Sequence, residues 1–98
     1  MAEEFILKKK ANHWRGILSD GGHLVLTKTQ LIFLPHRFNI GGKRIVIDLK
    51  DVSQILKVNV GLSSELQVSL KGGGVERFVV WGRDELLDEI NKQMKQTK

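Results

Sequence analysis

The side chains best suited to binding an anion lie in one glycine-containing segment, LPHRFNIGGKRIVI, which is flanked on both sides by apolar runs. Its basic and imidazole groups are His36, Arg37, Lys43 and Arg44. Guanidinium and ammonium groups bind phosphate and carboxylate oxygens through charge-assisted hydrogen bonds, so the segment could capture a negatively charged group. The same charges could instead keep a hairpin loop solvated and protect the edge of a sheet. Both interpretations stay open at this point.

Other kinds of reactive site have little support in the chain. Cysteine is absent, which excludes disulfides and cysteine-ligated zinc. The three histidines do not have the spacing of a metal site. Ser19, Asp20 and His23 are neighbours in sequence but lack the G-x-S-x-G elbow of a hydrolase, and GGK at 41–43 lacks the rest of a phosphate-binding loop. We therefore expect no catalysis, no metal and no cofactor.

The charge balance points in the same direction as the basic segment. The chain of 98 residues has a formal net charge of +5, and its densest basic run is KKK at 8–10. A positive surface attracts anionic lipid, nucleic acid or acidic protein, although this charge also serves simply to keep a small domain soluble. The KKK run could join a membrane-facing patch at ~1 kcal/mol per lysine, but a solvated stretch of strand is the interpretation we favour.

No targeting or spanning segment is expected. The N-terminus lacks a signal-peptide pattern, and no apolar run reaches the ~20 residues that cross a bilayer. We expect a soluble, cytoplasmic protein, for which peripheral association with a membrane stays open.

Short apolar runs recur along the chain at the spacing of β-strands. They cover residues 4–14, 22–27, 30–35, 43–49, 52–60, 65–70 and 75–81. Near the end the period becomes helical, because Leu87, Ile90 and Met94 fall at i, i+3 and i+7. The pattern predicts a single α+β domain over residues 1–98. About seven antiparallel strands would form a bent sheet or split barrel, capped by one helix at about 83–96 and followed by a frayed tail at 97–98.

The order of these elements predicts which loops meet. In an antiparallel meander, the first-to-second and third-to-fourth connections lie at the same end of the sheet. Here those connections are residues 15–21 and 36–44, so Arg15 is expected near the basic segment. A bent sheet can fold over on itself after the fourth strand, so this rule does not place the later loops.

Several motifs occur in an order typical of one known family. NH at 12–13 precedes GGHLVLTKTQLIFLPH at 21–36, then an IxL strand followed by DV at 47–52, then LQVSLKGGGVERFVVWGRDE at 66–85. With these motifs the chain resembles the GRAM domain family, a branch of the pleckstrin-homology-like superfold, and in particular its small stand-alone bacterial members.

The resemblance implies a pleckstrin-homology-like fold and a non-catalytic module that binds phosphoinositides, other anionic lipids or protein segments. Such domains typically hold headgroups at the open end, through basic residues near the first and third hairpin loops. Carried onto this chain, the resemblance implies ligand-binding roles for Arg15, His36, Arg37, Lys43 and Arg44.

Two alternatives to lipid binding remain. A protein partner could dock on an exposed sheet edge or on the open rim, with no lipid ligand. Nucleic acid is less well supported, since single-strand sites combine basic grooves with exposed aromatic residues. Aromatic residues make up only 6% of this chain, and Phe33 and Phe78 are expected in the core. The expected partner is therefore an anionic membrane lipid or a protein.

Overall fold

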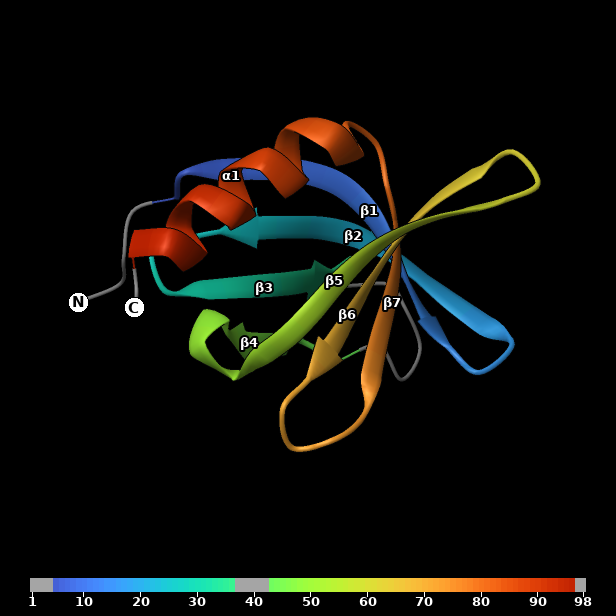
Figure 1. Cartoon of the computed structure of the whole chain (residues 1–98). Helices are drawn as coiled ribbons and strands as arrows, with labels where there is room; N and C mark the ends of the chain where they lie inside the picture. The colour runs from blue at the N-terminus through green and yellow to red at the C-terminus, as the bar shows by residue number, and fades with distance from the viewer. Residues whose placement is uncertain (1–4, 37–42, 97–98) are drawn as a thin grey trace.

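Seven antiparallel strands and one C-terminal helix make up the part of the chain that the computed structural model describes, residues 5–36 and 43–96 (Figure 1). The strands are β1 (Leu7–Arg15), β2 (Leu18–Leu26), β3 (Gln30–Pro35), β4 (Ile45–Asp48), β5 (Val52–Val60), β6 (Ser63–Leu70) and β7 (Val75–Val80). A short 3-10 helix, η1 (Leu49–Asp51), joins β4 to β5, and helix α1 covers Arg83–Gln96. The curled half-barrel with its terminal helix confirms the predicted α+β, pleckstrin-homology-like fold. The expected tail at 97–98 lies outside the described residues.

The sheet consists of two meanders joined through the first and last strands. Its order is β4-β3-β2-β1-β7-β6-β5. The first strand therefore pairs with the last, β1 with β7, although the two are far apart in the sequence. Trp81 extends this junction, because its backbone N–H donates to the Lys10 carbonyl at 3.0 Å. The two edge strands are β4 and β5, which η1 connects without pairing them.

The first hairpin is longer than the sequence indicated. Residues 18–21 were expected in a loop, but β2 begins at Leu18 and pairs with Arg15 of β1. The turn between them needs only Gly16, at φ +59°, and its neighbour. Farther along β2, a Cβ at Gly22 would lie 2.2 Å from the Leu34 carbonyl oxygen, so glycine allows β2 and β3 to approach closely.

One hydrophobic core lies inside the curl and joins the two meanders. Phe33 of β3 and Phe78 of β7 lie with their ring centroids 5.9 Å apart. The His13 ring packs against both, at 5.5 and 5.1 Å, and its Nε2 is 2.9 Å from Oε1 of Glu76. His13 is therefore a buried side chain of the core.

Helix α1 covers one opening of the curled sheet (Figure 1). Its buried side chains are Leu86, Ile90 and Gln93, and the predicted stripe residues Leu87 and Met94 are half-buried beside them. No helix in the described part of the chain is long and apolar enough to cross a bilayer.

Candidate functional site

The KKK run on β1 is divided between the two faces of the sheet. Lys9 points inward and forms an ion pair with Glu85 of α1. Because side chains alternate along a strand, Lys8 and Lys10 point to the opposite, outer face, where both are exposed. Only two of the three lysines are thus available on one surface.

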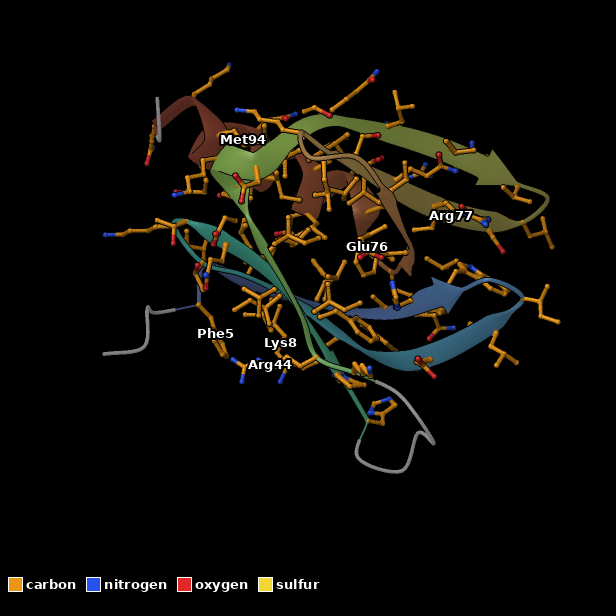
Figure 2. The ribbon with its side chains drawn as sticks, turned by 90° about the horizontal axis from the view of Figure 1, so that it is seen from below. Phe5, Lys8, Arg44, Glu76, Arg77 and Met94 are labelled. Carbon is orange, nitrogen blue, oxygen red and sulfur yellow. The ribbon has the colours of Figure 1, made fainter. Side chains whose placement is uncertain are left out.

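Strand register places further basic groups on this outer face. Lys10 is opposite His23 of β2, and His23 is opposite Leu34 of β3. The β3–β4 pairing ends at Phe33 and Ile45, so Arg44, the residue before β4, follows on the Leu34 side. We call Lys8, Lys10, His23, His36 and Arg44 the basic face. Figure 2 shows Lys8 and Arg44 on the same side of the ribbon, with Phe5.

His36 is held in position on this face by β2. Its backbone N–H donates to the Gly21 carbonyl at 2.9 Å. A Cβ at Gly21 would lie 3.2 Å from Cδ2 of the His36 ring, so the glycine leaves room for the imidazole. The rings of His36 and His23 then meet edge to face, with centroids 5.7 Å apart.

The cations of the basic face lack acidic partners. Lys8, Lys10 and Arg44 form no ion pair with another described residue. The acidic side chains on the described parts of β1 to β4 are Asp20, which is buried, and Asp48, which accepts a hydrogen bond from Gln30 at 2.9 Å.

The positive charges around His23 affect its protonation. Burial lowers the pKa of His23 below its usual 6.5, and the nearby charges of Lys8, His36 and Lys10 lower it further. Lys10 also lies over the exposed Trp81 ring, with Nζ 5.5 Å from its centroid. The basic face is thus a surface of uncompensated positive charge.

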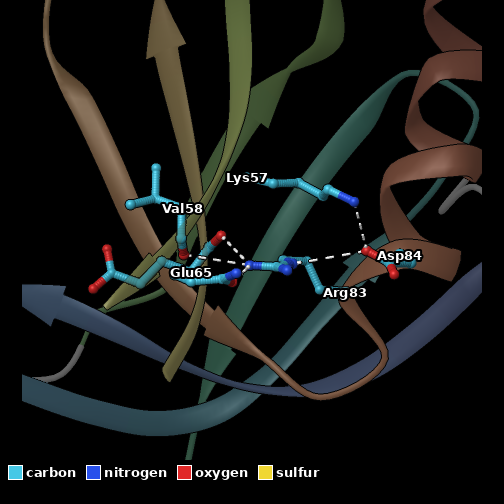
Figure 3. A network of polar contacts seen from close by, with 6 residues as sticks. Lys57, Val58, Glu65, Arg83 and Asp84 are labelled. Atoms are coloured by element: carbon cyan, nitrogen blue, oxygen red, sulfur yellow. Dashed lines mark hydrogen bonds and ion pairs between the residues drawn. The ribbon is translucent and has the colours of Figure 1, made fainter. Parts of the chain in front are cut away.

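Several charged residues in the other half of the molecule have partners. Arg83 Nη1 donates to the carbonyl oxygens of Val58 (3.3 Å) and Glu65 (3.2 Å) and to Oδ1 of Asn59 (2.9 Å), as Figure 3 shows in part. Beside it, Lys57 pairs with Asp84 at 3.1 Å (Figure 3). These groups join β5, β6 and the start of α1.

A buried carboxylate completes this network. Glu65 accepts hydrogen bonds from Nε and Nη2 of Arg77 at 3.1 and 3.0 Å. The bond from Arg77 is the main reason that the pKa of Glu65 lies below its usual 4.5. With their charges satisfied inside the protein, these residues stabilise the fold and are poor candidates for binding a ligand.

A pocket of about 490 Å³ lies beside this network, lined by residues 62–64 and 79–85. Arg83 is the one cation among the described residues that line the pocket, and it is already hydrogen-bonded to β5 and β6. Two acidic residues, Asp84 and Glu85, line the pocket beside it. The pocket therefore does not share the electrostatics of the basic face. Within the described residues no group of three or more His, Cys, Asp or Glu side chains could hold a metal ion.

The structure places the predicted site residues in three ways. His36, Lys43 and Arg44 come together at the ends of β3 and β4, and all three are exposed. Arg37 lies outside the described residues. The Arg15 backbone is at the tip of the first hairpin, four residues beyond Ala11 along β1. Ala11 is opposite Gly22, the residue at which the pairing of β2 with β3 ends. Arg15 thus lies about 13 Å beyond the end of that pairing, at ~3.3 Å per residue.

Sequence reasoning missed Lys8, Lys10 and His23 as members of one surface. The alternation within the KKK run could have separated Lys9 from its neighbours. The pairing of Lys10 with His23 needs the register between two strands, which periodicity within each strand does not specify.

Comparisons with known proteins establish the fold alone. No family model and no curated protein matches the chain, so the GRAM resemblance stays a prediction. The chain is similar to the crystal structure of the C-terminal domain of an unknown protein from Leishmania infantum. The TM-score is 0.82 at 15% sequence identity, over 94% of this chain and 84% of that one.

Proposed function

We propose that this chain is a non-catalytic module that docks on anionic lipid surfaces through the basic face. The observation that carries the proposal is the cluster on one face of three exposed cations, Lys8, Lys10 and Arg44, that form no ion pair with a described acidic residue. The resemblance to GRAM domains supports the same class of ligand.

The width of the basic face favours a membrane surface as its ligand over a single lipid headgroup. Its residues run from β1 to the start of β4, three strand spacings that amount to ~14 Å. One phosphate cannot contact cations over that distance, whereas several neighbouring headgroups can. Three apolar side chains, Phe5, Val46 and Trp81, are 59%, 50% and 51% exposed. Phe5 lies beside Lys8 (Figure 2), Val46 follows Arg44 by two residues on β4, and Trp81 lies under Lys10. Such side chains suit the boundary between headgroups and acyl chains.

The expected affinity is modest and depends on salt. A lysine or arginine near an anionic membrane contributes ~1 kcal/mol, and three permanent cations therefore contribute about 3 kcal/mol before ordering costs. Exposed charges are screened over ~8 Å at physiological ionic strength, so binding falls as salt is added.

The test compares two variants with the same net charge. Lys8→Gln with Arg44→Gln and Lys50→Gln with Lys71→Gln each change the formal charge from +5 to +3, that is 5 − 2. All four side chains are exposed, and the second pair lies away from the basic face, on η1 and the β6–β7 turn. Co-sedimentation with phosphatidylglycerol vesicles should show a roughly 30-fold loss for the first pair, from about 2 kcal/mol, and a much smaller loss for the second.

Two results would contradict the proposal. Equal losses for the two pairs would mean that global charge, not the basic face, determines binding. Preferential binding to a single-stranded oligonucleotide at the same ionic strength would point to nucleic acid instead, because both ligands share the salt dependence.

A second candidate function, protein binding, rests on the β5 edge. β5 is nine residues long and lies at the edge of the sheet, where β6 is the strand that pairs with it among the described residues. Leu56 and Val60 are 42% and 51% exposed, and the single charge on the strand, Lys57, pairs with Asp84. Edges without proline or free charges accept added strands.

This alternative has its own probe, a synthetic peptide of the β5 sequence VSQILKVNV. If the edge accepts an extended segment, the peptide should shift the NMR amide signals of β5, and leave those of β2 and β3 unchanged. Shifts spread over the whole domain, or none at millimolar peptide, would remove strand addition from consideration.

A further inference from the structure

The two imidazoles of the basic face are in unusual surroundings for surface histidines. His23 is half-buried, and its ring meets the exposed His36 ring edge to face at a centroid distance of 5.7 Å. The third histidine, His13, is on the inner face, where it contacts Glu76, so it does not belong to this pair. Two imidazole rings therefore lie inside a cluster of permanent cations, and imidazole is the side chain that ordinarily changes charge near neutral pH.

The charged residues that β1 and the start of β4 bring to this pair are positive. β1 supplies Lys8 and Lys10, both of which act on His23 electrostatically, and Arg44 precedes β4 on the same face. The described acidic group toward the outer side of these strands, Asp48, is at the far end of β4 and is bonded to Gln30. The carboxylate of α1 nearest to the KKK run, Glu85, is paired with Lys9 on the inner side.

Protonation of His23 is disfavoured in the free protein. Burial disfavours the charged form of this ring, and without a ligand a proton on it adds a like charge to Lys8 and Lys10. Phosphate groups placed over the same residues reverse the sign of the local field. A difference in proton affinity between the free and bound states makes binding depend on pH by thermodynamic linkage.

We propose that docking of an anionic lipid surface on the basic face is coupled to proton uptake by His23 and His36, so that the protein binds such surfaces more tightly as the pH falls. This inference rests on the proposed lipid-binding function and describes how that function is regulated. The basic face then acts as a pH-responsive surface, weakly attached near neutral pH and more firmly attached in mildly acidic conditions.

The expected size follows from linkage. Each proton taken up on binding increases the association constant by at most tenfold per pH unit. Histidine ordinarily titrates near pH 6.5, and the pKa of His23 lies below that value in the free protein, so binding should tighten as the pH falls from 7.5 to 5.5. We expect the affinity to rise by roughly 5- to 20-fold over that interval, which corresponds to partial uptake at two sites.

The experiment measures binding to phosphatidylglycerol vesicles at pH 7.5, 6.5 and 5.5 and constant ionic strength, because the phosphodiester charge does not change in this range. The proteins are the wild-type chain, His23→Gln with His36→Gln, and Lys8→Gln. The histidine variant should lose most of the increase in affinity between pH 7.5 and pH 5.5, with the increase measured relative to its own affinity at pH 7.5. The lysine variant should be weaker at every pH and keep the increase. Thermal unfolding at each pH confirms that all three are folded.

The outcomes separate this inference from the function on which it rests. Binding at pH 7.5 that does not change toward pH 5.5, or a pH dependence that the histidine variant retains, would overturn proton coupling and leave lipid binding intact. No preference for phosphatidylglycerol over phosphatidylcholine at any pH would overturn both. If the double variant fails to fold, His36→Gln alone suffices, because this exposed side chain should still remove part of the increase.

Discussion

The basic face and the network at the start of α1 both contain lysine and arginine side chains, but these are paired with acceptors only in the network. Near the start of α1, Arg83 binds a backbone carbonyl of β6, Arg77 binds the Glu65 carboxylate of β6, and Lys57 binds the Asp84 carboxylate of α1. On the outer side of β1 to β4, Lys8, Lys10 and Arg44 pair with no described acidic group. The comparison teaches that net charge says little about function in a small domain. Residues that hold the fold are distinguished by paired charges, and candidate binding residues by unpaired charges that cluster on one face.

Both regions depend on one shared core, which carries the largest expected effect. Phe78→Ala should lower the free energy of unfolding by about 3–5 kcal/mol, because it opens a cavity between Phe33 and His13. Urea denaturation followed by tryptophan fluorescence and by circular dichroism should give one coincident transition. Two separate transitions would show that the meanders have independent cores, and the two regions would then have to be compared as separate units.

The paired region should show the next largest effect. Arg83→Leu removes three hydrogen bonds and leaves the carbonyls of Val58 and Glu65 without this donor. We expect a loss of about 2–3 kcal/mol in urea denaturation, typical for bonds to a charged group in a half-buried site. Binding to phosphatidylglycerol vesicles should change only slightly. A large loss of binding with unchanged stability would place Arg83 among the ligand-binding cations and remove the distinction between the two regions.

Glu65 gives a smaller, pH-dependent effect in the same region. Its pKa is lowered in the folded protein, so its contribution is fully present above the unfolded value near 4.5 and is lost as the pH falls through the folded pKa. Glu65→Gln should cost about 1 kcal/mol at pH 6 and flatten the loss of stability below pH 4.5. Denaturation at pH 6, 4 and 3 measures both. An unchanged acid limb in the variant would assign that loss to another carboxylate.

Substitution of a cation on the basic face should have the smallest effect on stability, and the sign of that effect shows whether the cation is repelled by its neighbours. Lys8→Gln relieves repulsion among Lys8, Lys10 and Arg44, so stability should stay the same or rise by about 0.2–0.5 kcal/mol. Binding to phosphatidylglycerol vesicles should nevertheless fall roughly fivefold, from the loss of ~1 kcal/mol per lysine. A variant that loses stability and binding together would indicate that Lys8 has a structural partner, as Arg83 does.

Local patterns in the sequence determined much of this molecule. Alternation of apolar residues specified seven strands, and the change to a helical period located α1 at Arg83–Gln96 as the structure has it. The same patterns placed Phe33 and Phe78 in the core and the basic segment between β3 and β4. Periodicity succeeds here because it reflects which side of an element meets apolar surroundings, a property carried by residues only a few positions apart.

The tertiary structure alone decided how those elements meet. Register and curvature determine that β1 pairs with β7 and that His23 lies opposite Lys10. They also determine that Lys9 pairs with Glu85 of α1 whereas Lys8 faces outward. The Arg83 contacts likewise join residues 18 to 25 positions apart. Register is set by how whole faces pack, and a shift of one residue would exchange the two sides of a strand. The basic face therefore exists only in the folded sheet, because β1, β2 and the ends of β3 and β4 each contribute to it.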